Sequence, residues 1–90
     1  MNNERRIGIR KAISTITDLN SSLYDAKCDV ECYKDDEEEY RDNIPENLQG
    51  SERYEKADEA VTYLEEAIDK LEEAMQTIDE ALETIENALD

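Results

Sequence analysis

The sequence predicts an all-α protein: a long, coiled-coil-like antiparallel helical hairpin that pairs into a four-helix bundle dimer. Its 90 residues include only 2 Gly and 1 Pro, a composition that favours long uninterrupted helices. Apolar residues recur every three or four positions in both halves of the chain. The helix-breaking residues gather near the middle, over residues 42–51. We therefore expect a single domain over residues 1–90, with helices over about 4–41 and about 52–89.

The first expected helix has one apolar stripe. Its members are spaced by three or four residues: Ile9, Ile13, Ile16, Leu19, Leu23, Ala26, Val30 and Tyr33. β-branched residues cluster between Ile13 and Thr17 and lower the intrinsic helix propensity of this segment. Contacts with another helix must therefore hold it in place.

The turn contains residues that end one helix and begin the next. Pro45 disfavours helix at Ile44 and can open a short turn of its own. Gly50 suits the position after a helix end, and Ser51 suits the N-cap of the second helix. Ile44 and Leu48 can fold back onto the hairpin. The chain thus reverses direction once.

The second expected helix reads as a heptad repeat. Its a and d positions are apolar, and we expect them to form the core and the oligomer contacts: Val61, Leu64, Ile68, Leu71, Met75, Ile78, Leu82 and Ile85. Its g positions from residue 60 onward are all alanine: Ala60, Ala67, Ala74, Ala81 and Ala88. Its e positions are all acidic: Asp58, Glu65, Glu72, Asp79 and Glu86. Two copies of this helix cannot form e/g ion pairs, so it meets the first helix, and the wide apolar stripe favours dimerisation.

The charge is large and unevenly distributed. With 26 acidic and 10 basic residues, the chain has a net charge of −16, split between +2 in residues 1–27 and −18 in residues 28–90. Direct binding of nucleic acid or of a membrane surface needs basic patches, so we expect neither. No apolar run approaches the length of a membrane span, and the start lacks the apolar core of a secretory signal. We therefore expect a cytoplasmic protein.

Catalytic chemistry has few candidates. The chain has no His, which removes the commonest general base and transition-metal ligand. Glu65, Glu66 and Asp69 look like a fragment of the Mg²⁺-binding helices of all-α nucleotide pyrophosphatases, but they fall at the outward e, f and b positions. We therefore expect no enzyme activity, no catalytic or metal-binding residue and no cofactor.

Two cysteines lie one helical turn apart. Cys28 and Cys32 are half of a structural zinc site that no His completes, and a disulfide is not expected in a cytoplasmic protein. They are expected to be free thiols, or to form with Tyr24 a small contact ridge for a partner or a second subunit.

The densest acidity is expected around the turn. We define the acidic tip as ten carboxylates that the turn brings together: Asp35, Asp36, Glu37, Glu38, Glu39, Glu46, Glu52, Glu55, Asp58 and Glu59. The net charge of −16 exceeds the magnitude of about 2–8 that keeps a small domain soluble. A rigid rod with rows of negative charge resembles a nucleic-acid backbone electrostatically, so the acidic tip is the expected binding surface for a basic protein.

The turn also carries a family resemblance. The stretch Asp42–Tyr54 (DNIPENLQGSERY), followed by Ala-rich heptads, resembles small acidic proteins of Gram-positive phages, prophages and mobile elements. The resemblance covers about the C-terminal two-thirds of the chain and implies a two-helix protein that acts in the cytoplasm of a host cell. Small acidic phage proteins often inhibit host defence proteins or nucleic-acid enzymes.

These observations lead to two functional expectations. The first is a non-enzymatic homodimeric inhibitor whose negative surface mimics nucleic acid and blocks a basic defence or nucleic-acid-binding protein. The alternative is a structural or assembly module that oligomerises through its Ala/aliphatic stripe, with acidity serving only solubility.

Overall fold

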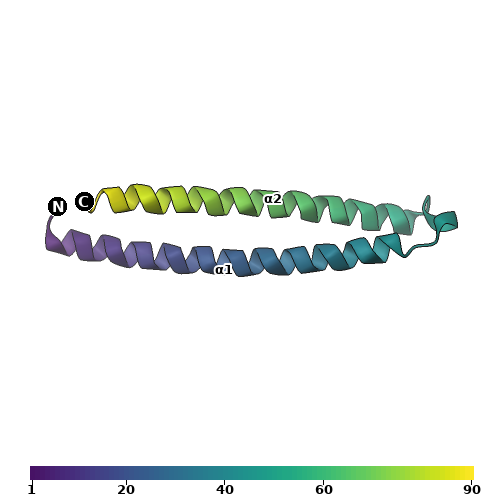
Figure 1. Ribbon diagram of the computed structural model, residues 1–90, viewed down its shortest axis with the longest axis horizontal. Helices are drawn as coiled ribbons and strands as arrows, with labels where there is room; N and C mark the ends of the chain where they lie inside the picture. Colours follow the sequence, from purple (N-terminus) through teal and green to yellow (C-terminus); the bar gives the residue numbers. More distant parts are fainter.

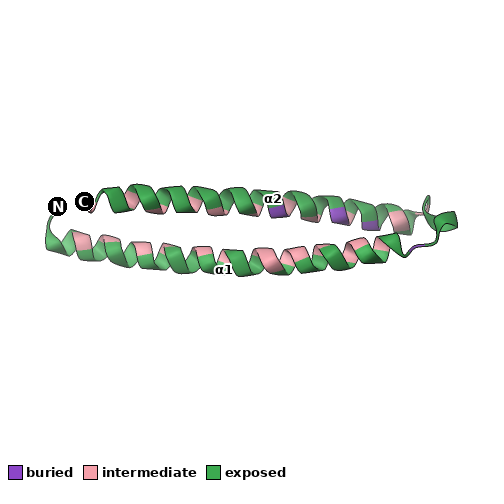
Figure 2. Cartoon of the chain, viewed as in Figure 1, coloured by how far each residue is buried: buried purple, intermediate pink, exposed green.

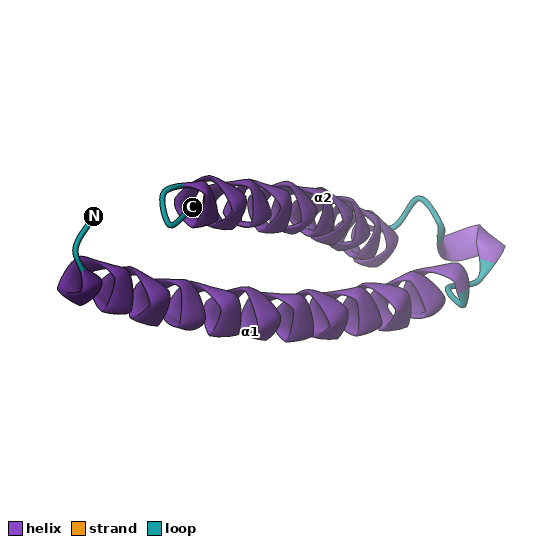
Figure 3. Ribbon diagram, turned by 60° about the vertical axis from the view of Figure 1, so that its left-hand side comes forward, coloured by secondary structure: helices purple, strands orange, loops and turns teal.

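The computed structural model describes all 90 residues as two long helices joined by a short connection. The elements are α1 (Asn3–Asp42), one turn of 3-10 helix, η1 (Glu46–Leu48), and α2 (Glu52–Asn87). The long helices lie side by side and run in opposite directions, with both chain ends at one end of the rod and the turn at the other (Figures 1 and 3). The rod measures 70 × 15 × 14 Å. The predicted all-α hairpin is thus confirmed, and neither helix contains a stretch apolar and long enough to cross a membrane.

Side chains cap the start of both long helices. The Asn2 side chain accepts a hydrogen bond from the Arg5 backbone N–H at 2.8 Å. Ser51 does the same for the Tyr54 N–H at 3.3 Å, as predicted from the sequence. Gly50 follows η1 without the positive φ that usually selects glycine after a helix end. The turn therefore depends on Ser51 more than on Gly50.

The core is narrow and lies toward the turn. Only four residues are buried, and all are apolar: Ile44, Ala57, Val61 and Ile68. Figure 2 shows that the buried part of α2 lies in the half nearer the turn, whereas the half nearer the chain ends is only partly covered. All eight residues of the predicted α2 stripe are buried or half-buried, because their a and d positions face α1.

The predicted stripe of α1 is wrong at three positions. Leu19 and Tyr33 are 60% and 68% exposed, and Ala26 is also exposed. The α1 residues that face α2 instead recur at strict three- and four-residue steps: Arg6, Ile9, Ile13, Ile16, Asn20, Leu23, Lys27, Val30, Lys34, Glu37 and Arg41. In this register the a positions of α1 are Arg6, Ile13, Asn20, Lys27, Lys34 and Arg41, so five of the six are polar. Three of them, Asn20, Lys27 and Lys34, stand next to the g residues Leu19, Ala26 and Tyr33 that the sequence pattern favoured.

Candidate functional site

A ladder of polar contacts joins the a row of α1 to the acidic e row of α2. Its three rungs are Arg41 Nη1 to Asp58 Oδ1 at 2.9 Å, Lys27 Nζ to Glu72 Oε1 at 3.2 Å, and Asn20 Nδ2 to Asp79 Oδ1 at 2.8 Å. From one rung to the next, the residue number falls in α1 by as much as it rises in α2, as an antiparallel heptad register requires. The e row thus has a structural role: it accepts hydrogen bonds from Arg41, Lys27 and Asn20 of α1 in a single alignment of the two helices.

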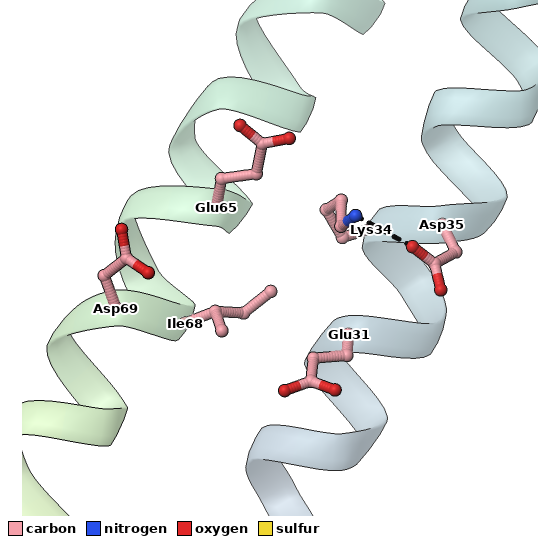
Figure 4. Close-up of a pocket in the computed structure, with 6 residues that line it drawn as sticks. All are labelled: Glu31, Lys34, Asp35, Glu65, Ile68 and Asp69. Atoms are coloured by element: carbon pink, nitrogen blue, oxygen red, sulfur yellow. Dashed lines mark ion pairs between the residues drawn. The ribbon is translucent and has the colours of Figure 1, made fainter.

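Lys34 occupies the rung between Arg41 and Lys27 but turns toward its own helix. Its Nζ lies 2.8 Å from Asp35 (Figure 4) and 3.2 Å from Glu38. It lines an open groove of about 270 Å³ between the helices, together with Glu31, Asp35, Glu65, Ile68 and Asp69. Lys34 is the one cation among four carboxylates in this groove, so it offsets their mutual repulsion.

Contacts with carboxylates raise the pKa of three cations of α1. Hydrogen bonds from Lys34 to Asp35 and then Glu38 raise its pKa from 10.5 to about 12. The pKa of Lys27 is raised by its hydrogen bonds to Glu31 and Glu72. The pKa of Arg41 is raised as well, first by its hydrogen bond to Asp42. Each cation is therefore held in its charged form more strongly in the hairpin than in the unfolded chain.

We expect the hairpin to lose stability as the pH rises from 10.5 toward about 12. The folded state binds the Lys34 proton more tightly, so this contribution is complete below pH 10.5 and disappears as the pH passes the raised pKa. Urea unfolding followed by circular dichroism across this range measures the change. The Lys34→Arg variant stays charged in this range, so its free energy of unfolding should fall by less. An equal fall in both proteins would show that Lys34 is not the group responsible.

The acidic tip divides into paired and unpaired carboxylates. Four members form ion pairs within the chain: Asp35 and Glu38 with Lys34, Asp58 with Arg41, and Glu52 with Lys56. Six form none: Asp36, Glu37, Glu39, Glu46, Glu55 and Glu59. Glu37 is half-buried on the side facing α2, and the other five are exposed. These five are the part of the tip that is free to meet another molecule.

A longer acidic surface runs along α2. We define the α2 acidic side as eleven carboxylates, all exposed: Asp58, Glu59, Glu65, Glu66, Asp69, Glu72, Glu73, Asp79, Glu80, Glu83 and Glu86. Lys70 is the only cation in this stretch. At a rise of 1.5 Å per residue, the stretch holds about one carboxylate per 4 Å of helix. Ion pairs with α1 engage only Asp58 and Glu72.

The thiols contribute no assembled site. Cys28 is half-buried and Cys32 exposed, and both are free. Tyr24 is 52% exposed, with Lys27 Nζ 5.6 Å from its ring centroid. No three His, Cys, Asp or Glu side chains converge in a way that could hold a metal ion.

The sequence pattern missed the polar ladder. Its signal was present, because Asn20, Lys27, Lys34 and Arg41 recur every seven residues, matching the seven-residue acidic repeat of α2. Apolar periodicity alone cannot detect such a match. Comparison of the chain with protein-family models, with curated proteins and with solved structures found no match in any of the three.

Proposed function

We propose that this chain is a non-enzymatic binding protein whose negative surface occupies the basic groove of a nucleic-acid-binding or defence protein and inhibits it. The observation that carries the proposal is the α2 acidic side, with eleven exposed carboxylates and one cation, Lys70. Their spacing of about 4 Å approaches the 3.4 Å per phosphate along one DNA strand. A basic groove built for phosphates would therefore meet a similar density of charge.

The geometry adds two properties that such a mimic needs. The carboxylates lie on a helix that is held straight by its partner along a 70 Å rod, so little conformational entropy is lost on binding. The free carboxylates of the acidic tip extend the same negative surface around the turn. A field of one sign over this length speeds association with a basic protein and makes it depend on salt.

The proposal includes a homodimer, formed as a four-helix bundle in the cytoplasm of a host cell. A second candidate function, an assembly module, is favoured by one specific observation. Leu19, Tyr33 and Tyr63 are each at least 60% exposed on a hairpin that already has its own core. Large exposed apolar side chains mark a surface that another protein covers.

A variant of α2 with fewer negative charges tests the inhibitor proposal. Glu66→Gln/Glu73→Gln/Glu80→Gln removes three exposed carboxylates that make no ion pair in the hairpin. The matched control, Glu4→Gln/Asp18→Asn/Asp25→Asn, removes three unpaired carboxylates from the basic start of α1. Both variants have the same net charge, so a difference in the amount of protein they retain shows that the position of the carboxylates matters, and not only their number.

The assay is capture from a Gram-positive bacterial lysate at low and high salt, with duplex DNA as competitor. We expect retained proteins to be released by salt and by DNA, and the α2 variant to retain about tenfold less than the control. A third variant, Asp36→Asn/Glu39→Gln/Glu46→Gln, measures how much of the binding depends on the acidic tip. Equal retention by all variants, or retention that DNA does not compete, would refute the mimic.

A further inference from the structure

One side of the hairpin lacks acidic rows. At the turn, Arg53 Nε donates a hydrogen bond to the Tyr40 hydroxyl at 2.5 Å, and its guanidinium lies 5.2 Å from the Tyr40 ring centroid. Both residues are at g positions, so the contact shows that the g rows of α1 and α2 share one side. The remaining members of these rows are Arg5, Ala12, Leu19, Ala26 and Tyr33 in α1, and Ala60, Ala67, Ala74, Ala81 and Ala88 in α2. We call this side, with the flanking c positions, the alanine face.

The alanine face is exposed except at the half-buried Ala60 and Ala67, largely apolar, and differently charged from the rest of the chain. Leu19, Tyr33 and Tyr63 are 60%, 68% and 67% exposed on it. Its charged residues are Arg5, Arg53, Lys56 and Lys70 against Asp29 and Asp36, a net charge of +2. The remainder of the chain therefore carries −18. Two copies with a net charge of −16 can approach through this side without placing acidic rows against each other.

The accessible surface of the hairpin is larger than that of a typical folded monomer of the same mass. It exposes 6699 Å², whereas a folded monomer of 10.4 kDa exposes about 5,400 Å². The excess of about 1,300 Å² lies within the area that each subunit of an obligate dimer buries. With only four buried residues, the single hairpin has a small core that a second apolar layer would enlarge.

We propose that two copies pack through their alanine faces, antiparallel to each other, with the turns at opposite ends and a two-fold axis at Ala74. This inference rests on the proposed dimer and adds its face and orientation; it does not depend on any partner of the α2 acidic side. A two-fold axis across the rods places α2 beside α2 and α1 beside α1 of the second copy.

The alanine row is symmetric about Ala74. Reversal there brings Ala60 level with Ala88 of the second copy, and Ala67 level with its Ala81. Only small side chains then lie between the two α2 helices, which permits a close approach.

The same axis suits α1. If the register of the polar ladder is followed along the rod, Ala74 lies level with Asp25 of α1. If the register of the Tyr40–Arg53 contact is followed, Ala74 lies level with Leu19. The axis therefore crosses α1 midway between these two residues, near Ser22. Reversal near Ser22 brings Leu19 beside Ala26 of the second copy, and likewise Ala12 beside Tyr33. In both pairs a large side chain meets a small one, as interdigitating layers require.

Charge decides between the two possible orientations. Arg5 lies on the alanine face and forms no ion pair within the hairpin. With the turns at opposite ends, Arg5 lies beside the acidic end of the second α1, near Asp36, which is also on the alanine face. With the turns at the same end, the two acidic tips would lie together and repel each other. The antiparallel arrangement thus brings Arg5, which the single hairpin leaves unpaired, close to an opposite charge.

Sedimentation equilibrium of the full chain tests whether two copies associate through the alanine face. We expect a mass twice the chain mass of 10.4 kDa. Ala74→Glu places two carboxylates at the axis and should weaken the dimer at least about a hundredfold, while helicity by circular dichroism is kept because Ala74 is exposed in the hairpin. Gln76→Glu adds the same charge at an exposed position outside the face and should leave the mass unchanged. A monomeric native chain, or equal effects of the two variants, would overturn the proposed face.

Disulfide formation tests the orientation. In a Cys28→Ser/Cys32→Ser background, Ala74→Cys should cross-link to itself on mild oxidation, because its two copies meet at the axis. Ala60→Cys should not, but it should cross-link with Ala88→Cys when the two variants are mixed. A dimer in which Ala60→Cys cross-links to itself and Ala74→Cys does not would refute the antiparallel arrangement. Neither measurement uses the captured partner, so failure here is distinguishable from failure of the inhibitor proposal.

Discussion

Val61→Asp is expected to destabilise the hairpin strongly. Val61 is 2% exposed, and the core at the turn holds only three other buried residues. A carboxylate there loses its hydration without gaining a partner, and a buried unpaired charge typically costs about 3–5 kcal/mol. A chain of this size is stable by about 5–13 kcal/mol, and a loss of about 4 kcal/mol lowers Tm by about 15–30 °C. Thermal melting followed by circular dichroism at 222 nm measures the loss.

Thr62→Asp provides the matched control. It adds the same side chain one residue away at an exposed position, where surface substitutions usually change stability by less than about 0.5 kcal/mol. We expect its melting curve to stay close to that of the native chain. Similar melting curves for Val61→Asp and Thr62→Asp would mean that the core at the turn does not hold the helices together.

Replacing the polar residues of the ladder by leucine is expected to stabilise the protein and to loosen its specificity. Asn20 is the clearest site, because its Oδ1 is buried without a hydrogen-bond partner, and Lys27 and Lys34 have side chains only 15% and 20% exposed. Leucine at the three positions adds apolar contacts worth about 1 kcal/mol each and removes the desolvation of polar groups. The triple variant should therefore melt about 12–24 °C higher than the native chain.

The same substitutions should make the register and the oligomeric state less uniform. Polar residues at a positions, Asn above all, specify register and helix number at the expense of stability. Sedimentation of the triple leucine variant should show species larger than those of the native chain. Lys11→Leu, at an exposed position outside the ladder, should change neither property. A lower Tm for the triple variant would show that the ladder stabilises the hairpin rather than specifying its register.

The sequence alone predicted the helices and the turn because each has a local cause. Few Gly and Pro residues permit long helices, and Ser51 caps α2 through a hydrogen bond to a neighbour three residues away. The orientation of α2 was also readable. Its apolar a and d positions, alanine g positions and acidic e positions repeat every seven residues without a break, so the a and d side is the one expected to face α1.

The side of α1 that faces α2 was decided by the tertiary structure. Two adjacent rows compete for that role: the apolar Leu19, Ala26 and Tyr33 at g, and the polar Asn20, Lys27 and Lys34 at a. Hydropathy favours the first row. That prediction is wrong because the hydropathy pattern considers one helix at a time. The acidic e row of α2 attracts the second row, through contacts such as that between Lys27 and Glu72. Electrostatic matching between helices thus turns the polar row inward and leaves the apolar row exposed on the alanine face.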